Sequence, residues 1–463
     1  MTESILFRSV EIEGRVTNLR VEGGVIVAIG DDLPATDAEI IEGEGGALIP
    51  GLHDHHVHLL AMAARKSGVD LDPMRDATSV DRALGAAAIS VDGDGWLRVT
   101  GYDEHHHGEL SGARLDALAP RTKIRIQHRS GLAWFLSGAG LDAVGAETSG
   151  STLFEQDTNG SLTGWLHRGD AWLATRVPQV APSLAPVSRE LASFGITGVT
   201  DATVEPGAGR LEILRSAVLS GDLVQELTIL GAESAAELDG WAHLGPYKLL
   251  VDDVLGLDPD GLAQRITSVH AMGRAVAIHA VSRSETVTAV TALMLAGVRE
   301  GDRIEHGSVL PADLDRALAS SGVVVIVQPS LVFERGDHYF DQVDPDDMPF
   351  LHRHAGLLAI GVRVAAGSDA PVTSADPWAA LAAASTRRTR EGRLLGESEK
   401  VPAAIALNWF LGSPQAPAGP VRRLVPGAAA DLCLLDRPLE AALLAPESSV
   451  VRMTFVAGRL TYS

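Results

Sequence analysis

The chain has 463 residues, 46% of them hydrophobic, and a formal net charge of −22 at pH 7. This length suits one large barrel with an accessory module, and the negative charge argues against nucleic acid or an anionic membrane as a partner. The single cysteine, Cys433, excludes an internal disulfide and a thiolate metal cluster, and no apolar run approaches the roughly 20 residues that cross a bilayer.

Both ends of the chain have the pattern of short antiparallel strands. Runs such as Gly24–Ile29 alternate apolar and polar residues between turns, and the same style returns at Val451–Val456. We therefore predict that residues 1–49 and 421–463 pair into one small β-sandwich module. The first residues lack a basic segment followed by an apolar one, so we expect a cytoplasmic protein.

The segment Pro50–His58 delivers two histidines, His56 and His58, at the end of an apolar run. On a strand, residues i and i+2 point to the same side. One strand could therefore supply two neutral nitrogen ligands to a divalent metal, as a catalytic zinc site requires. A polar strand end facing water would show the same pattern. By alternation the neighbours face away, so we expect packing or surface positions for His53 and His55, and a supporting role for Asp54.

Between the two ends, apolar strands alternate with amphipathic helices, which is typical of βα units and a parallel sheet. Eight strands are predicted, at Gly51–Leu59, Gly195–Thr203, Leu227–Gly231, Tyr247–Asp252, Ala275–Val281, Arg303–Val309, Val323–Pro329 and Val362–Asp369. Helices are predicted at Leu211–Ser220, Leu262–Met272, Ser284–Ala296, Leu314–Ser320 and Leu351–Ile360. This order most simply closes into a (β/α)8 TIM barrel with its functional groups at the C-terminal ends of the strands. We assign residues 50–63 and 191–420 to it.

The first two predicted barrel strands are separated by a large insertion, residues 64–190. It has strand-like runs of its own at Trp96–Thr100 and Lys123–Gln127. We expect it to cover the barrel mouth. Trp134 and Trp165 could then line a substrate pocket, although packing in a core is the more common fate of such residues.

Ionisable residues gather at the predicted strand ends. Besides the two histidines of the first strand, these are Lys248, His279, His306 and Asp369. Taken singly, each has an ordinary explanation: a core histidine, a helix cap for the aspartate, or a strand end reaching solvent for the lysine. A buried ammonium is costly unless it is paired or neutralised. The joint placement of all six residues at the ends of different strands favours a metal site at the barrel mouth.

The segment Phe333–Phe350 follows the seventh predicted strand and is acidic and long enough to act as a lid. Three of its residues, Arg335, His338 and Tyr339, are candidates for contact with substrate.

Several segments carry a family signature: Pro50–His58, Lys248, Ile278-His279-Ala280, Arg303–Gly307, Gly367–Pro371 and Pro426–Asp431. They resemble the metal-dependent amidohydrolase superfamily over nearly the whole chain. Gly101–Glu104, Leu115-Asp116, Gly164 and the long insertion further resemble the branch that contains N-substituted formamide deformylase. In that branch a histidine often follows the glycine that matches Gly131, where this chain has Leu132, so one polar contact with substrate is expected to be missing.

The resemblance implies a role for each residue of the cluster. His56, His58 and Asp369 would hold the more buried of two divalent ions, expected to be zinc, and His279 and His306 the more exposed one. Lys248, carboxylated by carbon dioxide, would bridge them together with a hydroxide. Asp369 would take the proton from the attacking hydroxide and pass it to the leaving nitrogen. The implied activity is hydrolysis of a non-peptide C–N (amide) bond of a small molecule at a binuclear, metal-binding site.

Alternatives remain open. A mononuclear cyclic-amidine deaminase would fit the barrel, but such relatives usually have a glutamate three positions after the strand-five histidine, and here that position is Ser282. A lactone, ester or phosphotriester hydrolase would use the same metals. A non-catalytic scaffold would be expected to have lost ligands, whereas every ligand position is filled. The sequence allows a homodimer and does not identify the substrate.

Overall fold

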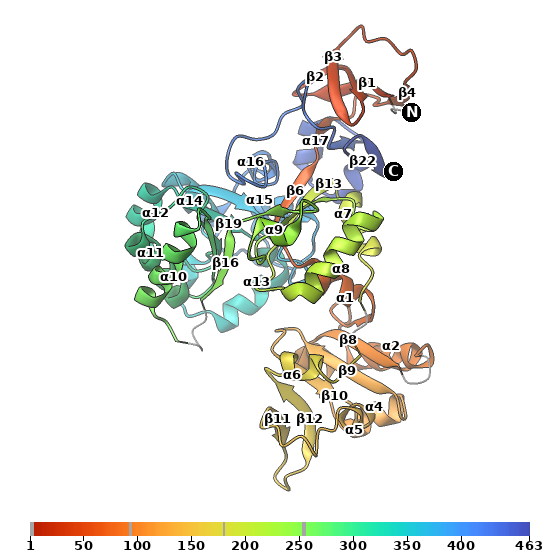
Figure 1. The fold of residues 1–463 in the computed structure, drawn as a ribbon, viewed down its shortest axis with the longest axis vertical. Coiled ribbons are helices and arrows are strands. Elements are labelled where there is room, and N and C mark those ends of the chain that lie inside the picture. Colours follow the sequence, from red (N-terminus) through yellow and green to blue (C-terminus); the bar gives the residue numbers. More distant parts are fainter. Residues whose placement is uncertain (1–3, 92–94, 179–180, 252–255) are drawn as a thin grey trace. The chain divides into compact units, whose positions relative to one another are not determined.

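The computed structural model describes residues 4–91, 95–178, 181–251 and 256–463. Within them the chain forms two compact units (Figure 1). The smaller unit is Leu60–Pro186, and the larger unit joins the N-terminal residues through Leu59 to Val187–Ser463. None of the helices among the described residues is both long and apolar enough to span a membrane.

The two chain ends form two four-stranded sheets in the larger unit. One sheet has the order β3-β2-β1-β4, formed by β1 (Ser4–Ile12), β2 (Arg15–Glu22), β3 (Val25–Gly30) and β4 (Glu39–Glu42). The other has the order β23-β22-β21-β5, formed by β5 (Leu48–Pro50), β21 (Leu432–Leu435), β22 (Val451–Val456) and β23 (Arg459–Tyr462). Alternate apolar residues of both sheets share one core, in which the Phe7 and Phe455 rings meet edge to face at 5.0 Å. Cys433 is buried in β21 and has no disulfide.

Parallel strands form two further sheets of the larger unit. One sheet has the order β15-β14-β13-β6 and the other β16-β17-β18-β19-β20. Their bounds are β6 (Leu52–Val57), β13 (Ile196–Asp201), β14 (Glu226–Ile229), β15 (His243–Leu244), β16 (Tyr247–Leu250), β17 (Val276–Ala280), β18 (Arg303–His306), β19 (Val324–Val327) and β20 (Arg363–Ala366). Eight of these nine coincide with predicted strands. The fold is α/β and TIM-barrel-like.

Backbone hydrogen bonds join the two parallel sheets at both of their outer edges. At one edge the Lys248 amide donates to the Leu230 carbonyl oxygen at 3.3 Å. At the other, the Asp369 amide donates to His56 O at 2.7 Å and the His58 amide to Ala370 O at 2.9 Å. The ends of the first and last parallel strands, β6 and β20, are therefore tied together next to the expected metal ligands.

Helices follow most of these strands, as predicted. They include α8 (Gly207–Ser220), α10 (Pro259–Ala271), α11 (Arg283–Ala296), α12 (Asp315–Ser321) and α14 (His354–Ala359). The helix predicted at Leu351–Ile360 begins later because His352 has a φ of 51°, in the left-handed region that a helix excludes. The predicted lid is largely helical, as α13 (Ser330–Gln342). The end of the strand predicted at Tyr247–Asp252 lies outside the described residues.

The smaller unit contains a six-stranded sheet of order β11-β12-β10-β9-β8-β7. Its strands are β7 (Val69–Asp70), β8 (Trp96–Tyr102), β9 (Lys123–His128), β10 (Ala133–Leu136), β11 (Phe154–Gln156) and β12 (Leu162–His167). Alternate residues such as Leu97, Val99 and Ile124 form one core with α2 (Ala77–Ile89) and α4 (Gly112–Leu118). The two strand-like runs predicted in the insertion are β8 and β9.

Candidate metal centre

His56 and His58 lie at the C-terminal end of β6. Their rings are 5.4 Å apart, and both face the carboxylate of Asp369. The Asp369 Oδ1 lies 3.5 Å from His56 Nε2 and 3.2 Å from His58 Nε2. Two imidazoles from the first parallel strand and a carboxylate from the segment after the last one thus converge, as the sequence predicted.

The backbone around Asp369 brings this carboxylate into place. Asp369 has a φ of 57°, which is uncommon for a residue other than glycine. Two residues earlier, a Cβ at Gly367 would lie 2.4 Å from the His56 backbone nitrogen. Only glycine allows the segment after β20 to approach β6 so closely. Asp54 reinforces the contact, because its Oδ1 accepts hydrogen bonds from the His56 amide at 3.0 Å and the Ser368 amide at 2.9 Å.

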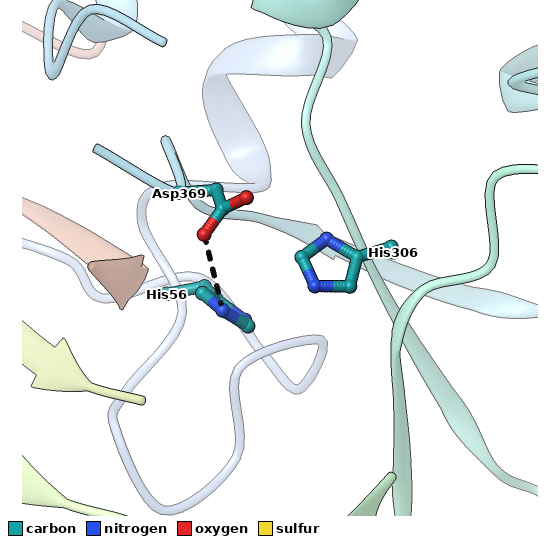
Figure 2. Close-up of side chains that lie close together, drawn as sticks. All are labelled: His56, His306 and Asp369. Carbon is teal, nitrogen blue, oxygen red and sulfur yellow. Dashed lines mark ion pairs between the residues drawn. The ribbon is translucent and has the colours of Figure 1, made fainter. Parts of the chain in front are cut away.

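His306 ends β18 and also has left-handed backbone, with a φ of 70°. Its ring lies 4.8 Å from that of His56 and 4.6 Å from that of His279, at the end of β17. One ligand atom each from His56, His306 and Asp369 lie within 4.8 Å of one another, and all three residues are buried (Figure 2). This spacing is suited to side chains that share divalent cations.

Two further residues orient these imidazoles, and neither role was predicted from the sequence. Glu305 on β18 accepts a hydrogen bond from His56 Nδ1 and another from the Arg303 guanidinium. Gln328 Oε1 lies 2.9 Å from His306 Nδ1. In both histidines the Nδ1 proton is therefore used, and the Nε2 lone pair is free to bind a metal. A buried acid beside a ligand histidine, as in the segment Arg303–Gly307, is the signal that could have revealed Glu305.

Burial favours the neutral imidazoles that metals bind. It lowers the pKa of His56, His279 and His306 from the ordinary value, and the charge of Lys248 lowers them further. Burial also lowers the pKa of His58, but the hydrogen bond to Asp369 and the charges of Asp369 and Asp201 together outweigh it, so that this pKa is raised. Asp369 shows the reciprocal effect: the His58 hydrogen bond and the nearby positive charges overcome burial and lower its pKa.

Lys248 on β16 is buried, and its Nζ has no hydrogen-bond partner among the described residues. Burial lowers its pKa to about 8, even though the charges of Glu305 and Asp369 act in the opposite direction. His56 Nε2 is likewise buried without a hydrogen-bond partner in that part of the chain. Unpartnered buried nitrogens are costly, so this donor set fits a site that binds divalent metal.

The remaining predicted site residues lie in two places. Tyr339 on α13 is partly buried, and burial and the charge of Asp369 raise the pKa of its hydroxyl. On the same helix, Arg335 donates to Val372 O at 3.2 Å, and His338 is partly buried. Trp134 and Trp165 pack within the smaller unit, where the Trp165 ring lies 5.3 Å from Phe135. The expectation that these tryptophans contact substrate stays a prediction.

His53 and His55 are both fully buried, with rings 4.5 Å apart. His53 Nε2 lies 2.9 Å from Thr200 Oγ1. The sequence left both a packed and a surface position open for these two histidines. The structure shows that both are packed in the interior.

Replacing Glu305 with glutamine is expected to weaken metal binding by about 10- to 100-fold, the usual cost of losing a partner that orients a ligand. The Glu305 carboxylate accepts from both His56 and Arg303. A glutamine side chain has only one oxygen, so its NH2 group would face one of these two donors. Competition against a chromogenic chelator measures the change. Glu300→Gln, an exposed position shortly before the same strand, is the matched control. Unchanged affinity in Glu305→Gln would contradict the orienting role.

The chain resembles known proteins along nearly its full length. Residues 39–462 match the family model described as Amidohydrolase family. N-substituted formamide deformylase from Arthrobacter pascens is 24% identical, over 96% of this chain and 94% of that protein. Putative amidohydrolase YtcJ from Bacillus subtilis is 22% identical, over 88% of this chain and 87% of that protein.

Solved structures extend this similarity to the fold. An uncharacterized metal-dependent hydrolase from Pyrococcus horikoshii superposes with a TM-score of 0.77 at 19% identity, covering 97% of this chain and 99% of that one. The family model spans well over half of the chain and includes every residue of the cluster. The protein therefore belongs to the amidohydrolase family, that of metal-dependent hydrolases acting on C–N bonds.

Proposed function

We propose that this protein hydrolyses a non-peptide amide bond of a small molecule at a pair of divalent metal ions. The observation that carries this proposal is the convergence of His56, His306 and Asp369 within 4.8 Å, beside the unpartnered Nζ of Lys248. One carboxylate and several neutral imidazoles form the donor set expected for zinc or a similar ion. The similarity to N-substituted formamide deformylase supports an N-substituted amide as the substrate class.

The proposed ligands fall into two groups. His56, His58 and Asp369 would hold one ion, and His279 and His306 the other. Lys248 would contribute to both once its neutral amine has been carboxylated, and its lowered pKa favours that reaction because only the neutral amine adds to carbon dioxide. Divalent ions bound there would lower the pKa of water and polarise the carbonyl group that is attacked.

Asp369 is the proposed proton carrier. Its Oδ1 lies 3.2 Å from His58 Nε2, and the contact with His58 and the nearby positive charges keep the pKa of the carboxylate low despite burial. An ionised carboxylate at this position can accept the proton of the attacking water and deliver it to the leaving nitrogen. Glu305 and Gln328 would hold the imidazoles of His56 and His306 so that each presents Nε2 to the metal.

Helix α13 is the proposed source of side chains that contact the substrate. Tyr339 lies close enough to Asp369 for the carboxylate charge to act on its hydroxyl. Arg335 is fixed to the loop that follows Asp369 through Val372 O. We propose that Arg335, His338 and Tyr339 contact the acyl or amine portion of the substrate.

The deaminase alternative is disfavoured by Ser282. At the position where such relatives are expected to have a glutamate, the Ser282 side chain caps α11 by accepting from the Glu285 amide, and Glu285 bonds back to complete a capping box. Lys248 would also have no role in that chemistry. Hydrolysis of lactones or other esters at the same metals remains the second candidate.

The proposal is tested by metal analysis of protein purified without chelator, together with a screen of N-formyl, N-acyl and cyclic amides and lactones. We expect about two divalent ions per chain, as in two-metal hydrolytic sites. We also expect faster turnover of amides than of lactones. A single tightly bound ion with release of ammonia from a ring substrate would favour the deaminase.

Removing the metal with a chelator is expected to abolish hydrolysis while leaving the secondary structure unchanged, because the described hydrophobic cores lie outside the ligand cluster. Adding back divalent zinc or manganese is expected to restore the rate. Circular dichroism of the stripped protein provides the control for unfolding. Full activity in protein shown to be free of metal would contradict a metal-dependent reaction.

A further inference from the structure

The sheet of the smaller unit carries two neighbouring arginines on the face away from the α2/α4 core. Arg98 on β8 and Arg125 on β9 are direct partners in the parallel register, and β10 lies beside β9 (Figure 1). Residues on either side of Arg98, Leu97 and Val99, point into that core. Alternation along the strand therefore directs both arginines to the opposite face.

Both guanidinium groups lie over the same indole ring. Arg98 Cζ is 5.5 Å and Arg125 Cζ 5.8 Å from the ring of Trp134 on β10. The indole nitrogen is already used, since Trp134 Nε1 donates to Asp170 Oδ1 at 2.9 Å. The ring thus contributes its π face to two cations at once, which positions the guanidinium groups without using their N–H donors.

Neither arginine has a hydrogen-bond or ion-pair partner among the described residues. Across the described residues, no hydrogen bond or ion pair reaches either guanidinium group, and both Nε atoms are buried. Burial lowers the pKa of Arg98, partly offset by the charge of Asp170. Burial and the charge of Arg98 lower the pKa of Arg125 to about 10, so both groups stay charged at neutral pH.

Other partly buried arginines of this unit are paired. Arg65 binds Asp70 and Asp72, Arg114 binds Asp81, and Arg129 binds Asp103. Arg176 also stacks on a tryptophan, Trp172, at 4.1 Å, but its guanidinium donates to nearby oxygens. Arg98 and Arg125 likewise lie over an indole ring, but in the part of the chain that the structure describes no oxygen accepts a hydrogen bond from them.

Like charges directly opposite on neighbouring strands destabilise a sheet, and a partly buried charge without a partner adds a desolvation cost. An anion that accepts from both groups would remove both penalties, and guanidinium groups match the oxygens of carboxylates and phosphates. We propose that Arg98 and Arg125, on the surface of Trp134, bind an oxyanion of a small molecule, either a carboxylate or a phosphate. This site lies within the smaller unit and does not depend on the metal centre.

The test uses the full-length protein, with inorganic phosphate and succinate as separate probes at constant ionic strength. Tryptophan fluorescence and Tm report binding. We expect a saturable change with at least one probe in wild type, and an apparent Kd at least about tenfold weaker in Arg98→Gln and Arg125→Gln, the effect of losing one charge-assisted hydrogen bond. Arg176→Gln, which removes a stacked arginine elsewhere in the unit, should leave binding unchanged.

A second measurement separates binding from a purely structural role. Without added anion, Arg125→Gln is expected to raise Tm or leave it unchanged, because repulsion with Arg98 is removed. A lower Tm with unaltered phosphate and succinate responses would make the pair a stacking element only and overturn the proposal. So would the absence of a saturable response in wild type, or an equal response in all variants. A response to phosphate alone or to succinate alone identifies the group that the site takes.

Discussion

Asp369→Asn is expected to fold normally and to lose about 10³-fold in kcat, within the range that general acid–base groups contribute. Asparagine has the same size, and its side-chain oxygen can still face His58 and His56. It cannot carry a proton from water to the leaving nitrogen at neutral pH. The steady-state rate on the best amide from the screen measures the loss, with the metal content of the same preparation determined in parallel.

The matched control is Asp376→Asn, which lies in the segment that follows. The Asp376 carboxylate caps α15 (Pro377–Thr386) by accepting from the Trp378 amide, and asparagine caps almost as well. This variant should retain wild-type turnover. If Asp369→Asn keeps its metal and still hydrolyses amides at nearly the wild-type rate, Asp369 is not the proton carrier.

The second large effect is expected at Lys248. Lys248→Ala should lose metal and fall in activity by about 10² or more, a loss at least as large as that from removing a group that only orients a ligand. The truncated side chain leaves a buried space at the position of Nζ. If the proposed carbamate is correct, acetate or propionate in the assay should supply its two oxygens and restore part of both metal content and rate.

Lys248→Arg is the informative companion variant. It keeps a positive charge in the same place, but a guanidinium group stays protonated and does not react with carbon dioxide. We expect it to be inactive and insensitive to added acetate. Full metal content and near wild-type rates in Lys248→Arg would show that the lysine acts as an ammonium, and the carbamate would have to be abandoned.

The strands and the six clustered residues could be predicted because their signals are local. Apolar runs mark strands that are covered on both faces, and β17 and β19 were located to within about two residues, the usual uncertainty of such boundaries. The tendency of barrel enzymes to place functional groups at the C-terminal strand ends then predicts that His56, His306 and Asp369 lie close together.

What the sequence did not reveal depends on contacts between distant residues. The pairing of Glu305 with His56 spans 249 positions, and no local pattern specifies it. The left-handed backbone at His306 and Asp369 is held by tertiary packing against ordinary side-chain preference. The cross-strand meeting of Arg98 and Arg125 requires the register of β8 and β9, which composition and periodicity leave open.

The link between the first and last parallel strands has a consequence for biosynthesis. The amide of Asp369 bonds to His56 O, and Asp54 bonds to the Ser368 amide, so the first and last ligand positions come together only after β20 has been made. A nascent chain that ends before this point lacks the carboxylate and the strand that supports it. Metal binding that uses this carboxylate therefore requires a chain that has been synthesised at least through Asp369, so a shorter nascent chain cannot form the complete site.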